Sequence, residues 1–135
     1  MSDYQSKYKN FIAAYRRLAE GVEIYTQDPS NTIVRDGLIQ RFEFTFELAW
    51  KTIKAVYEEE GLSTTSSPKP ILREAYAEGL IHDEQLWLDM LEDRNAVSHI
   101  YKEEIAADVC ADIKERYLAA IQGLIKVLQP RIHKQ

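Results

Sequence analysis

The amino-acid sequence predicts an all-α fold, an up-and-down four-helix bundle with one extra short helix. Hydrophobic residues make up 45% of the 135-residue chain and charged residues 29%, with only five glycines and four prolines, a composition typical of soluble helical proteins. Apolar residues recur every three or four positions over long stretches, as they do on one face of a helix. A chain of this length predicts one domain, residues 1–135.

The first helix is expected from about residue 4 to residue 25. Its apolar residues alternate steps of four and three, so they share one face that a second helix must cover. They are Tyr4, Tyr8, Phe11, Tyr15, Leu18, Val22 and Tyr25. An aromatic stripe can also stack on bases, but at helical spacing it is more often part of a core.

The second helix is expected from about Thr32 to Glu60, after a turn at residues 27–31, and Gly61 is suited to end it. Its buried face is predicted to contain Leu38, Ile39, Phe42, Phe46, Ala49, Trp50, Ile53, Val56 and Tyr57. A polar flank runs beside this face: Gln40, Glu43, Glu47, Lys51 and Lys54. The spacing allows two interpretations, a solvated surface with weak ion pairs or a polar wall that faces a site or a partner.

The prolines of residues 62–70 indicate a loop. Pro70 suits the first turn of a short third helix, expected from about Ile71 to Ala77 and ended by Gly79. Asp83 is placed to cap a fourth helix, whose apolar residues are Leu86, Trp87, Met90, Leu91 and Val97.

The chain is expected to change direction near residues 99–103 and to continue as one last helix that Pro130 ends. The face of this helix is predicted to contain Ile105, Val109, Ile113, Tyr117, Ala120, Leu124 and Leu128. Four long amphipathic helices and one short one then pack most simply as an antiparallel bundle.

Composition also excludes several kinds of protein. No apolar run approaches the roughly 20 residues of a membrane span, and the polar residues 1–10 do not resemble a secretory signal, so a cytoplasmic protein is expected. Cys110 is the single cysteine and is expected to be a small buried residue. No metal site or cofactor is expected. The net charge is −5, and no basic stripe suggests a dedicated nucleic-acid surface.

The segment from Asp93 to Tyr101 gathers several reactive side chains late in the chain. On a helical wheel, Arg94 lies on the apolar side with Trp87 and Leu91. Burial of an unpaired guanidinium is unfavourable, so Arg94 is expected to face a partner, a cleft or a subunit interface.

Arg94 and His99 are five residues apart, which separates them by about 140° on an unbroken helix. They converge only if the helix distorts or ends near His99, or if two copies of the segment meet. Histidine can move a proton to or from a ribose hydroxyl or a leaving oxygen, and a guanidinium can stabilise the charge on phosphorus. Asn95 can orient the imidazole. A capped helix end with a satisfied Arg94 and His99 remains the alternative.

Several longer motifs resemble the nucleotidyltransferase substrate-binding protein family, a branch of the HEPN superfamily of helical bundles. The resemblance runs from about Phe11 to Leu128. It rests on LIQRFEFTFELAWK at residues 38–51, SPK at 67–69, REAY at 73–76, GLI at 79–81 and WLDMLEDRNAVSHIY at 87–101.

This resemblance implies a HEPN-like homodimer that pairs with a minimal nucleotidyltransferase encoded nearby. It implies that Arg94 and His99, with Asn95 in the polar position after the arginine, form a metal-independent ribonuclease motif acting on RNA. In the toxin branch of toxin–antitoxin modules, a tyrosine at the position of Tyr101 is adenylylated by the partner to silence the ribonuclease.

Two alternatives remain open at this point. In the first, the protein is a non-catalytic subunit that presents a substrate or docks onto the nucleotidyltransferase. The acidic surroundings of the motif favour this alternative, because residues 83–104 contain seven acidic and two basic side chains. In the second, the bundle only dimerises. Under the ribonuclease prediction the catalytic residues are Arg94, Asn95 and His99, Tyr101 is the modification site, and Glu43, Glu47, Lys51 and Ser98 form a wall facing the site or the partner. His82 and His133 are given no role.

Overall fold

The computed structural model describes residues 3–62, 66–98 and 102–133. The elements in these residues are helical: α1 (Asp3–Gln27), α2 (Thr32–Glu59), α3 (Pro68–Ala77), α4 (Glu84–Val97), α5 (Glu103–Asp112), the π-helix η1 (Ile113–Tyr117) and α6 (Leu118–Ile132). Helices α1, α2, α4 and the α5–η1–α6 segment form the bundle, and α3 is the extra short helix. The prediction of an all-α bundle is confirmed.

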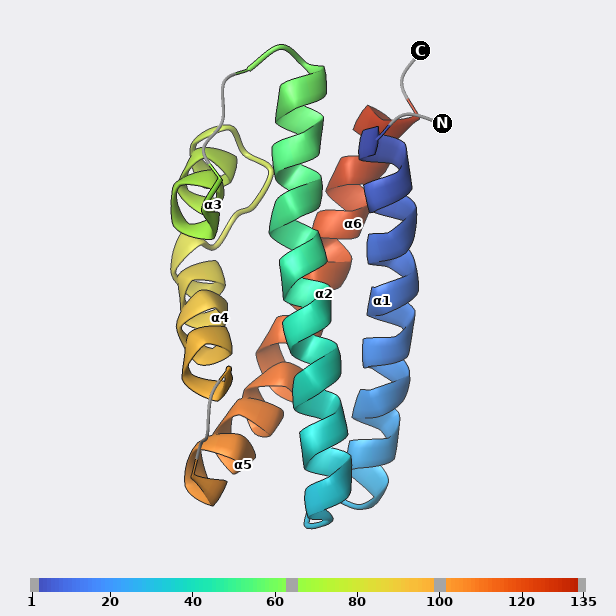
Figure 1. Ribbon diagram of the computed structural model, residues 1–135, viewed down its shortest axis with the longest axis vertical. Helices are drawn as coiled ribbons and strands as arrows, with labels where there is room; N and C mark the ends of the chain where they lie inside the picture. The colour runs from blue at the N-terminus through green and yellow to red at the C-terminus, as the bar shows by residue number, and fades with distance from the viewer. Residues whose placement is uncertain (1–2, 63–65, 99–101, 134–135) are drawn as a thin grey trace.

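Helix α2 is central: Figure 1 shows α1 on one side of it and α3 and α4 on the other. Asn31 caps its start, because its side-chain oxygen accepts hydrogen bonds from the backbone N–H groups of Ile33 at 2.9 Å and Val34 at 3.2 Å. All nine residues predicted for its inner face are buried. The 3.6-residue period therefore located this face correctly.

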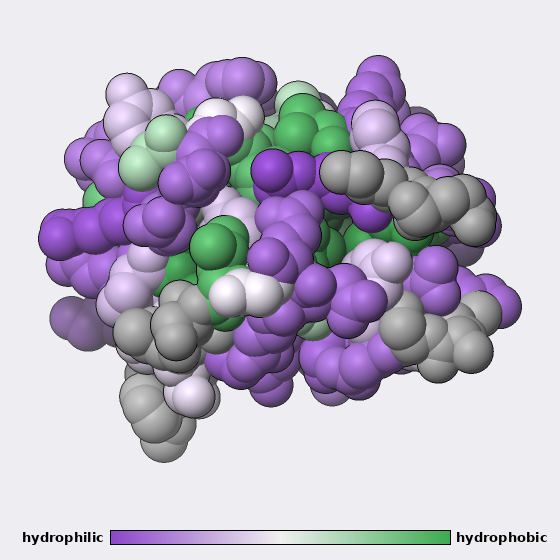
Figure 2. Space-filling view, turned by 90° about the horizontal axis from the view of Figure 1, so that it is seen from above, coloured by the Kyte–Doolittle hydropathy of each residue, from purple (hydrophilic) through white to green (hydrophobic). Residues whose placement is uncertain are grey.

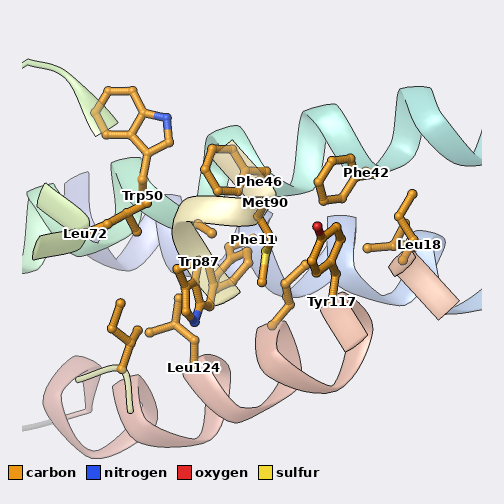
Figure 3. Close-up of a cluster of buried hydrophobic side chains, with 14 of the residues drawn as sticks. Phe11, Leu18, Phe42, Phe46, Trp50, Leu72, Trp87, Met90, Tyr117 and Leu124 are labelled. Atoms are coloured by element: carbon orange, nitrogen blue, oxygen red, sulfur yellow. The ribbon is translucent and has the colours of Figure 1, made fainter. Parts of the chain in front are cut away.

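The aromatic residues of α2 join the elements around it (Figure 3). The ring of Phe42 stacks on that of Tyr117 of η1, with centroids 5.5 Å apart. The ring of Phe46 lies 6.4 Å from that of Trp87 of α4. Seen from the end where both termini lie, the surface is mostly hydrophilic, with apolar side chains showing between the polar ones (Figure 2).

Two glycines end helices as predicted. Gly61 and Gly79 have φ angles of +84° and +82°, a left-handed conformation that glycine adopts without strain. After Gly61, the N–H of Leu62 donates to the carbonyl of Tyr57 at 2.9 Å. After Gly79, the N–H of Leu80 donates in the same way to the carbonyl of Ala75. This hydrogen-bond pattern satisfies carbonyls left open at a helix end.

Helix α3 begins earlier than predicted, at Pro68 rather than near Pro70. The first turn of a helix does not use its N–H groups. Both Pro68 and Pro70 can therefore lie in this turn without losing a hydrogen bond.

The prediction of one unbroken last helix was wrong. The five-residue π-helix η1 separates α5 from α6, and Ile105, assigned to the buried face, is 38% exposed while Ala106 is buried. The core residues Val109, Ile113, Tyr117 and Ile121 are four apart. Steps of four drift around a helix of 3.6 residues per turn, and a wider π turn brings them back onto one face.

The prediction that Pro130 ends the last helix was wrong. Helix α6 continues to Ile132. Pro130 removes one intrahelical hydrogen bond, but the turn that follows buries Ile132 to 1% exposure, and this burial offsets the loss. Within the described residues, no helix is long and apolar enough to cross a membrane.

Candidate functional site

Arg94 lies in the last turn of α4 and faces α2. Its side chain is 24% exposed. The guanidinium forms an ion pair with Glu47 of α2 through Nη2, donates from Nη1 to Oδ1 of Asn95 at 2.9 Å, and lies 6.0 Å from the centroid of the Phe46 ring. The arginine is therefore half-buried and held by a carboxylate on the neighbouring helix.

Glu47 is the centre of this arrangement. Besides Arg94, its carboxylate accepts a hydrogen bond from the indole N–H of Trp50 at 3.2 Å and pairs with Lys51 at 3.3 Å. Burial acts to raise the pKa of Glu47, but the hydrogen bonds from Trp50, Arg94 and Lys51 and the charge of Arg94 together lower this pKa below its ordinary value. Glu47 is therefore charged at neutral pH.

Glu43 lies one turn before Glu47 and meets the end of α4. The hydroxyl of Ser98 lies 3.3 Å from Oε2 of Glu43 and 2.6 Å from the carbonyl oxygen of Arg94. Burial raises the pKa of Glu43, and the Ser98 hydroxyl and the Arg94 charge only partly offset this effect. Two carboxylates with opposite pKa shifts thus flank one guanidinium.

These side chains line an open groove of about 560 Å³ between α2 and α4. Its lining residues are Gln40, Glu43, Phe44, Glu47, Arg94 and Ser98. The structure therefore brings together the predicted wall residues Glu43, Glu47 and Ser98 with Arg94, while Lys51 and Asn95 join through their contacts with Glu47 and Arg94. A groove holding a guanidinium beside titratable groups can bind a phosphate and exchange protons.

His99 and Tyr101 lie outside the described residues. Helix α4 ends at Val97 and α5 begins at Glu103. The five-residue step from Arg94 to His99 therefore extends past the end of α4, which removes the objection that an unbroken helix would keep the two residues apart.

Two features of this region were missed from the sequence. Phe44 is 62% exposed at the groove, and its position two residues from both Phe42 and Phe46 on α2 already placed it off the buried face. The second is a hydrogen bond of 2.5 Å from the Tyr117 hydroxyl to Asp93. No sequence signal linked these two residues, because their contact depends on the π turn.

The Asp93–Tyr117 contact joins the last turn of α4 to η1. Burial raises the pKa of Asp93, and the acids Asp112, Asp89 and Glu92 add to the rise, although the Tyr117 hydroxyl opposes it. Burial and the bond to Asp93 also raise the pKa of Tyr117. Asp93 and Arg94, neighbours in sequence, are thus each anchored to a different element.

The described residues contain no group of three or more His, Cys, Asp or Glu side chains arranged to hold a metal ion. Cys110 is fully buried, and burial raises the pKa of its thiol to about 11. Its expected role as a small buried residue is confirmed.

Comparison with known proteins places the chain in a family. Residues 6–130 match the family model described as nucleotidyltransferase substrate binding protein like. The chain is 36% identical over 112 residues to a Haemophilus influenzae protein named probable ribonuclease HepT, and the match covers 77% of this chain and 76% of the relative.

Solved structures share the fold. A Thermus thermophilus protein is similar with a TM-score of 0.78 and 34% identity, covering 88% of this chain and 98% of that one. A Haemophilus influenzae protein, described as revealing the fold of a substrate binding domain of a nucleotidyltransferase, has a TM-score of 0.78 and 30% identity, covering 90% and 98%.

A more distant structure, at 17% identity, is the tri-AMPylated HEPN toxin of Shewanella oneidensis in complex with MNT antitoxin. Its TM-score is 0.77, with 96% of this chain and 98% of that chain covered. This likeness concerns the fold. The chain therefore has the HEPN fold and belongs to the nucleotidyltransferase substrate binding protein-like family.

Proposed function

We propose that this protein is a metal-independent endoribonuclease, the toxin of a toxin–antitoxin module whose other member is a minimal nucleotidyltransferase encoded nearby. The observation that carries the proposal is the half-buried Arg94, held in an open groove at the end of α4, five residues before His99. The relative named probable ribonuclease HepT supports the same activity.

The proposed chemistry needs only side chains. His99 removes the proton from a ribose 2′-hydroxyl, whose oxygen attacks the adjacent phosphorus, or it protonates the 5′-oxygen that leaves. Arg94 binds the phosphate oxygens as negative charge develops on them. Asn95 accepts a hydrogen bond from Arg94 at 2.9 Å, and its proposed role is to orient the imidazole through its amide. An arriving phosphate replaces Glu47 as the partner of Arg94.

The active form in this proposal is a homodimer. Phe44 leaves 62% of its surface exposed beside Arg94. A Cβ added at Gly37, two turns earlier on α2, would meet no heavy atom of the chain within 4 Å, so packing within the described chain does not require this helix-weakening glycine. An apolar side chain and a bare backbone beside the groove suit close approach of a second copy, which would bring two Arg94 residues near one axis.

Tyr101 is the proposed point of control, in the cytoplasm, by the nucleotidyltransferase. Transfer of AMP from ATP would join the tyrosine oxygen to the α-phosphorus and release pyrophosphate. The product places a phosphodiester's negative charge and a nucleoside two residues from His99. This addition would repel RNA from the groove.

The test is incubation of the purified protein with RNA in the presence of a metal chelator. The wild type is expected to cleave RNA, and His99→Ala is expected to lose the activity. Equal cleavage by the two proteins would overturn the proposed mechanism, and absence of cleavage by the wild type would overturn the proposed activity.

A second candidate is a non-catalytic subunit that docks onto the nucleotidyltransferase. The observation in its favour is that Glu43 and Glu47 flank Arg94 and make the groove less attractive to RNA. Co-expression with the neighbouring nucleotidyltransferase separates the candidates by intact mass. Adenylyl increments that disappear in Tyr101→Phe support the toxin, whereas unmodified wild type that is harmless when expressed alone supports the binding subunit.

A further inference from the structure

A second hollow lies beside the Arg94 groove, between α1 and α2. It has a volume of about 280 Å³ and is lined by Lys7, Trp50, Lys51, Lys54, Glu58 and Ser66. Figure 1 shows that α1 begins and α2 ends at the same end of the bundle, which is how Lys7 of α1 meets the lysines of α2. Three lysine side chains, with one carboxylate, Glu58, thus line one concave surface of an acidic protein. We call it the lysine hollow.

The three ammonium groups are held by weak contacts. Each forms an ion pair one turn away on its own helix: Lys7 with Asp3 at 3.7 Å, Lys51 with Glu47 at 3.3 Å and Lys54 with Glu58 at 2.9 Å. Such pairs contribute little and are screened by salt. An ammonium group carries three donors, so an ion pair with one carboxylate leaves room for the oxygens of an incoming phosphate.

The lysine hollow and the Arg94 groove are linked by the ion pairs of Glu47. One oxygen of this carboxylate pairs with Lys51 and the other with Arg94. Lys51 and Arg94 therefore stand on either side of a single carboxylate. A phosphate bound by Arg94 would have the lysine hollow as its immediate neighbour along α2.

We propose that the lysine hollow is a phosphate-binding subsite, which takes backbone phosphates of a single-stranded RNA next to the one held by Arg94. This inference rests on the proposed ribonuclease function and names where its substrate runs. Arg94 alone, flanked by Glu43 and Glu47 in a chain of net charge −5, offers little attraction for a polyanion, whereas each added lysine contact strengthens it. A small concave hollow suits a flexible strand better than a rigid duplex.

The experiment measures binding of a fluorescent single-stranded DNA oligonucleotide, which lacks the 2′-hydroxyl and so reports binding without cleavage. The dissociation constant is determined at several salt concentrations for the wild type and for Lys7→Gln, Lys51→Gln, Lys54→Gln and the triple variant. Lys114→Gln is the matched control, because Lys114 is an exposed lysine on η1, outside the lysine hollow.

Each lysine that contacts a phosphate is expected to contribute about 0.7 to the slope of log affinity against log salt. Its loss therefore weakens binding about fivefold at 0.1 M salt, and the triple variant loses the sum of the three contributions. Lys114→Gln is expected to keep the wild-type slope. Wild-type slope and affinity in the triple variant would overturn the proposal.

Two further outcomes distinguish a wrong phosphate subsite from a wrong ribonuclease proposal. A third outcome distinguishes binding of nucleic acid from binding of a protein. If the wild type cleaves RNA and the triple variant does so with unchanged KM, the subsite is wrong while the ribonuclease stands. If the wild type binds the oligonucleotide through the lysines but cleaves no RNA, the ribonuclease is wrong while the subsite stands. If the triple variant binds nucleic acid normally but loses the nucleotidyltransferase, the hollow is a protein-docking site and the proposal fails.

Discussion

At the scale of single residues, the Arg94–Glu47 pair connects the fold with the proposed chemistry. The Glu47 carboxylate accepts a hydrogen bond from Trp50 and forms ion pairs with Lys51 and Arg94. These contacts fix the position of the guanidinium before any substrate binds. The pair joins α4 to α2 and so also contributes to the stability of the bundle. Glu43 and Glu47 have opposite pKa shifts, so their contributions to the unfolding free energy should change with pH in opposite directions.

The stability contribution of Glu47 is expected to depend on pH. Its pKa is lowered on folding, so this contribution is present above the ordinary value of 4.5 and is lost as the pH falls through the lowered pKa. Urea unfolding of the wild type and Glu47→Gln should therefore show a difference in unfolding free energy at pH 7 that shrinks below about pH 4.5.

Glu43→Gln is the matched control for this measurement. The raised pKa of Glu43 means that its contribution is most favourable at acid pH and is lost as the pH rises through the folded pKa. The unfolding free energy of Glu43→Gln should therefore increase relative to that of the wild type as the pH rises, the reverse of the trend for Glu47→Gln. The same pH trend in both variants would contradict the assigned shifts.

At the scale of elements, most helices follow from local sequence, and the departures have physical causes. The face of α2, the cap at Asn31 and the ends at Gly61 and Gly79 depend on neighbouring residues, and for this reason they were predictable. The π turn is not local, since it satisfies the packing of Tyr117 on Phe42 and its bond to Asp93. The Arg94–Glu47 contact is not local either, so the sequence did not predict it. The position of Arg94 on the helical wheel indicated only that its side chain faces away from solvent.

Loss of the Tyr117 hydroxyl is expected to affect both stability and the site. Tyr117→Phe removes the donor to the half-buried Asp93 carboxylate and should lower the unfolding free energy by about 1–3 kcal/mol. Because Asp93 precedes Arg94 on α4, the last turn of that helix should loosen and RNA cleavage should fall. Thermal unfolding and the cleavage rate, measured below the unfolding transition, check the two effects.

Tyr8→Phe provides the comparison for Tyr117→Phe. Tyr8 is also buried, and its hydroxyl donates to the carbonyl of Ile125 at 3.2 Å, away from α4. It should lose stability without a change in the cleavage rate of the folded protein. If Tyr117→Phe also kept the wild-type rate, the π turn would serve packing alone.

At the scale of the whole molecule, the bundle presents an open groove at which the apolar side chain of Phe44 stays exposed in the described part of the chain. The sequence motif pointed to this face, and the family assignment agrees with the HEPN fold. The side-chain positions of His99 and Tyr101 could not follow from helical periodicity, because both residues come after the end of α4. A second copy of the chain is the proposed cover.

Dimerisation is expected to depend on Phe44. Replacement of this 62% exposed side chain by serine should weaken self-association by at least about tenfold without unfolding the bundle. Sedimentation equilibrium measures the effect. Tyr76→Ser is the control, since Tyr76 on α3 is also exposed, at 48%, but does not line the groove. Equal association constants for both variants would place the interface elsewhere.

The central claim, that Arg94 is catalytic rather than only an ion-pair partner, is tested most directly by the cleavage rate of Arg94→Lys in chelator. Lysine keeps the charge but loses the forked donors, so kcat should fall about 100-fold. Arg35→Lys is the matched control, because the Arg35 side chain is 22% exposed and pairs with Glu103 of α5 at 3.4 Å. It should cleave at the wild-type rate. Wild-type kcat in Arg94→Lys would contradict the account.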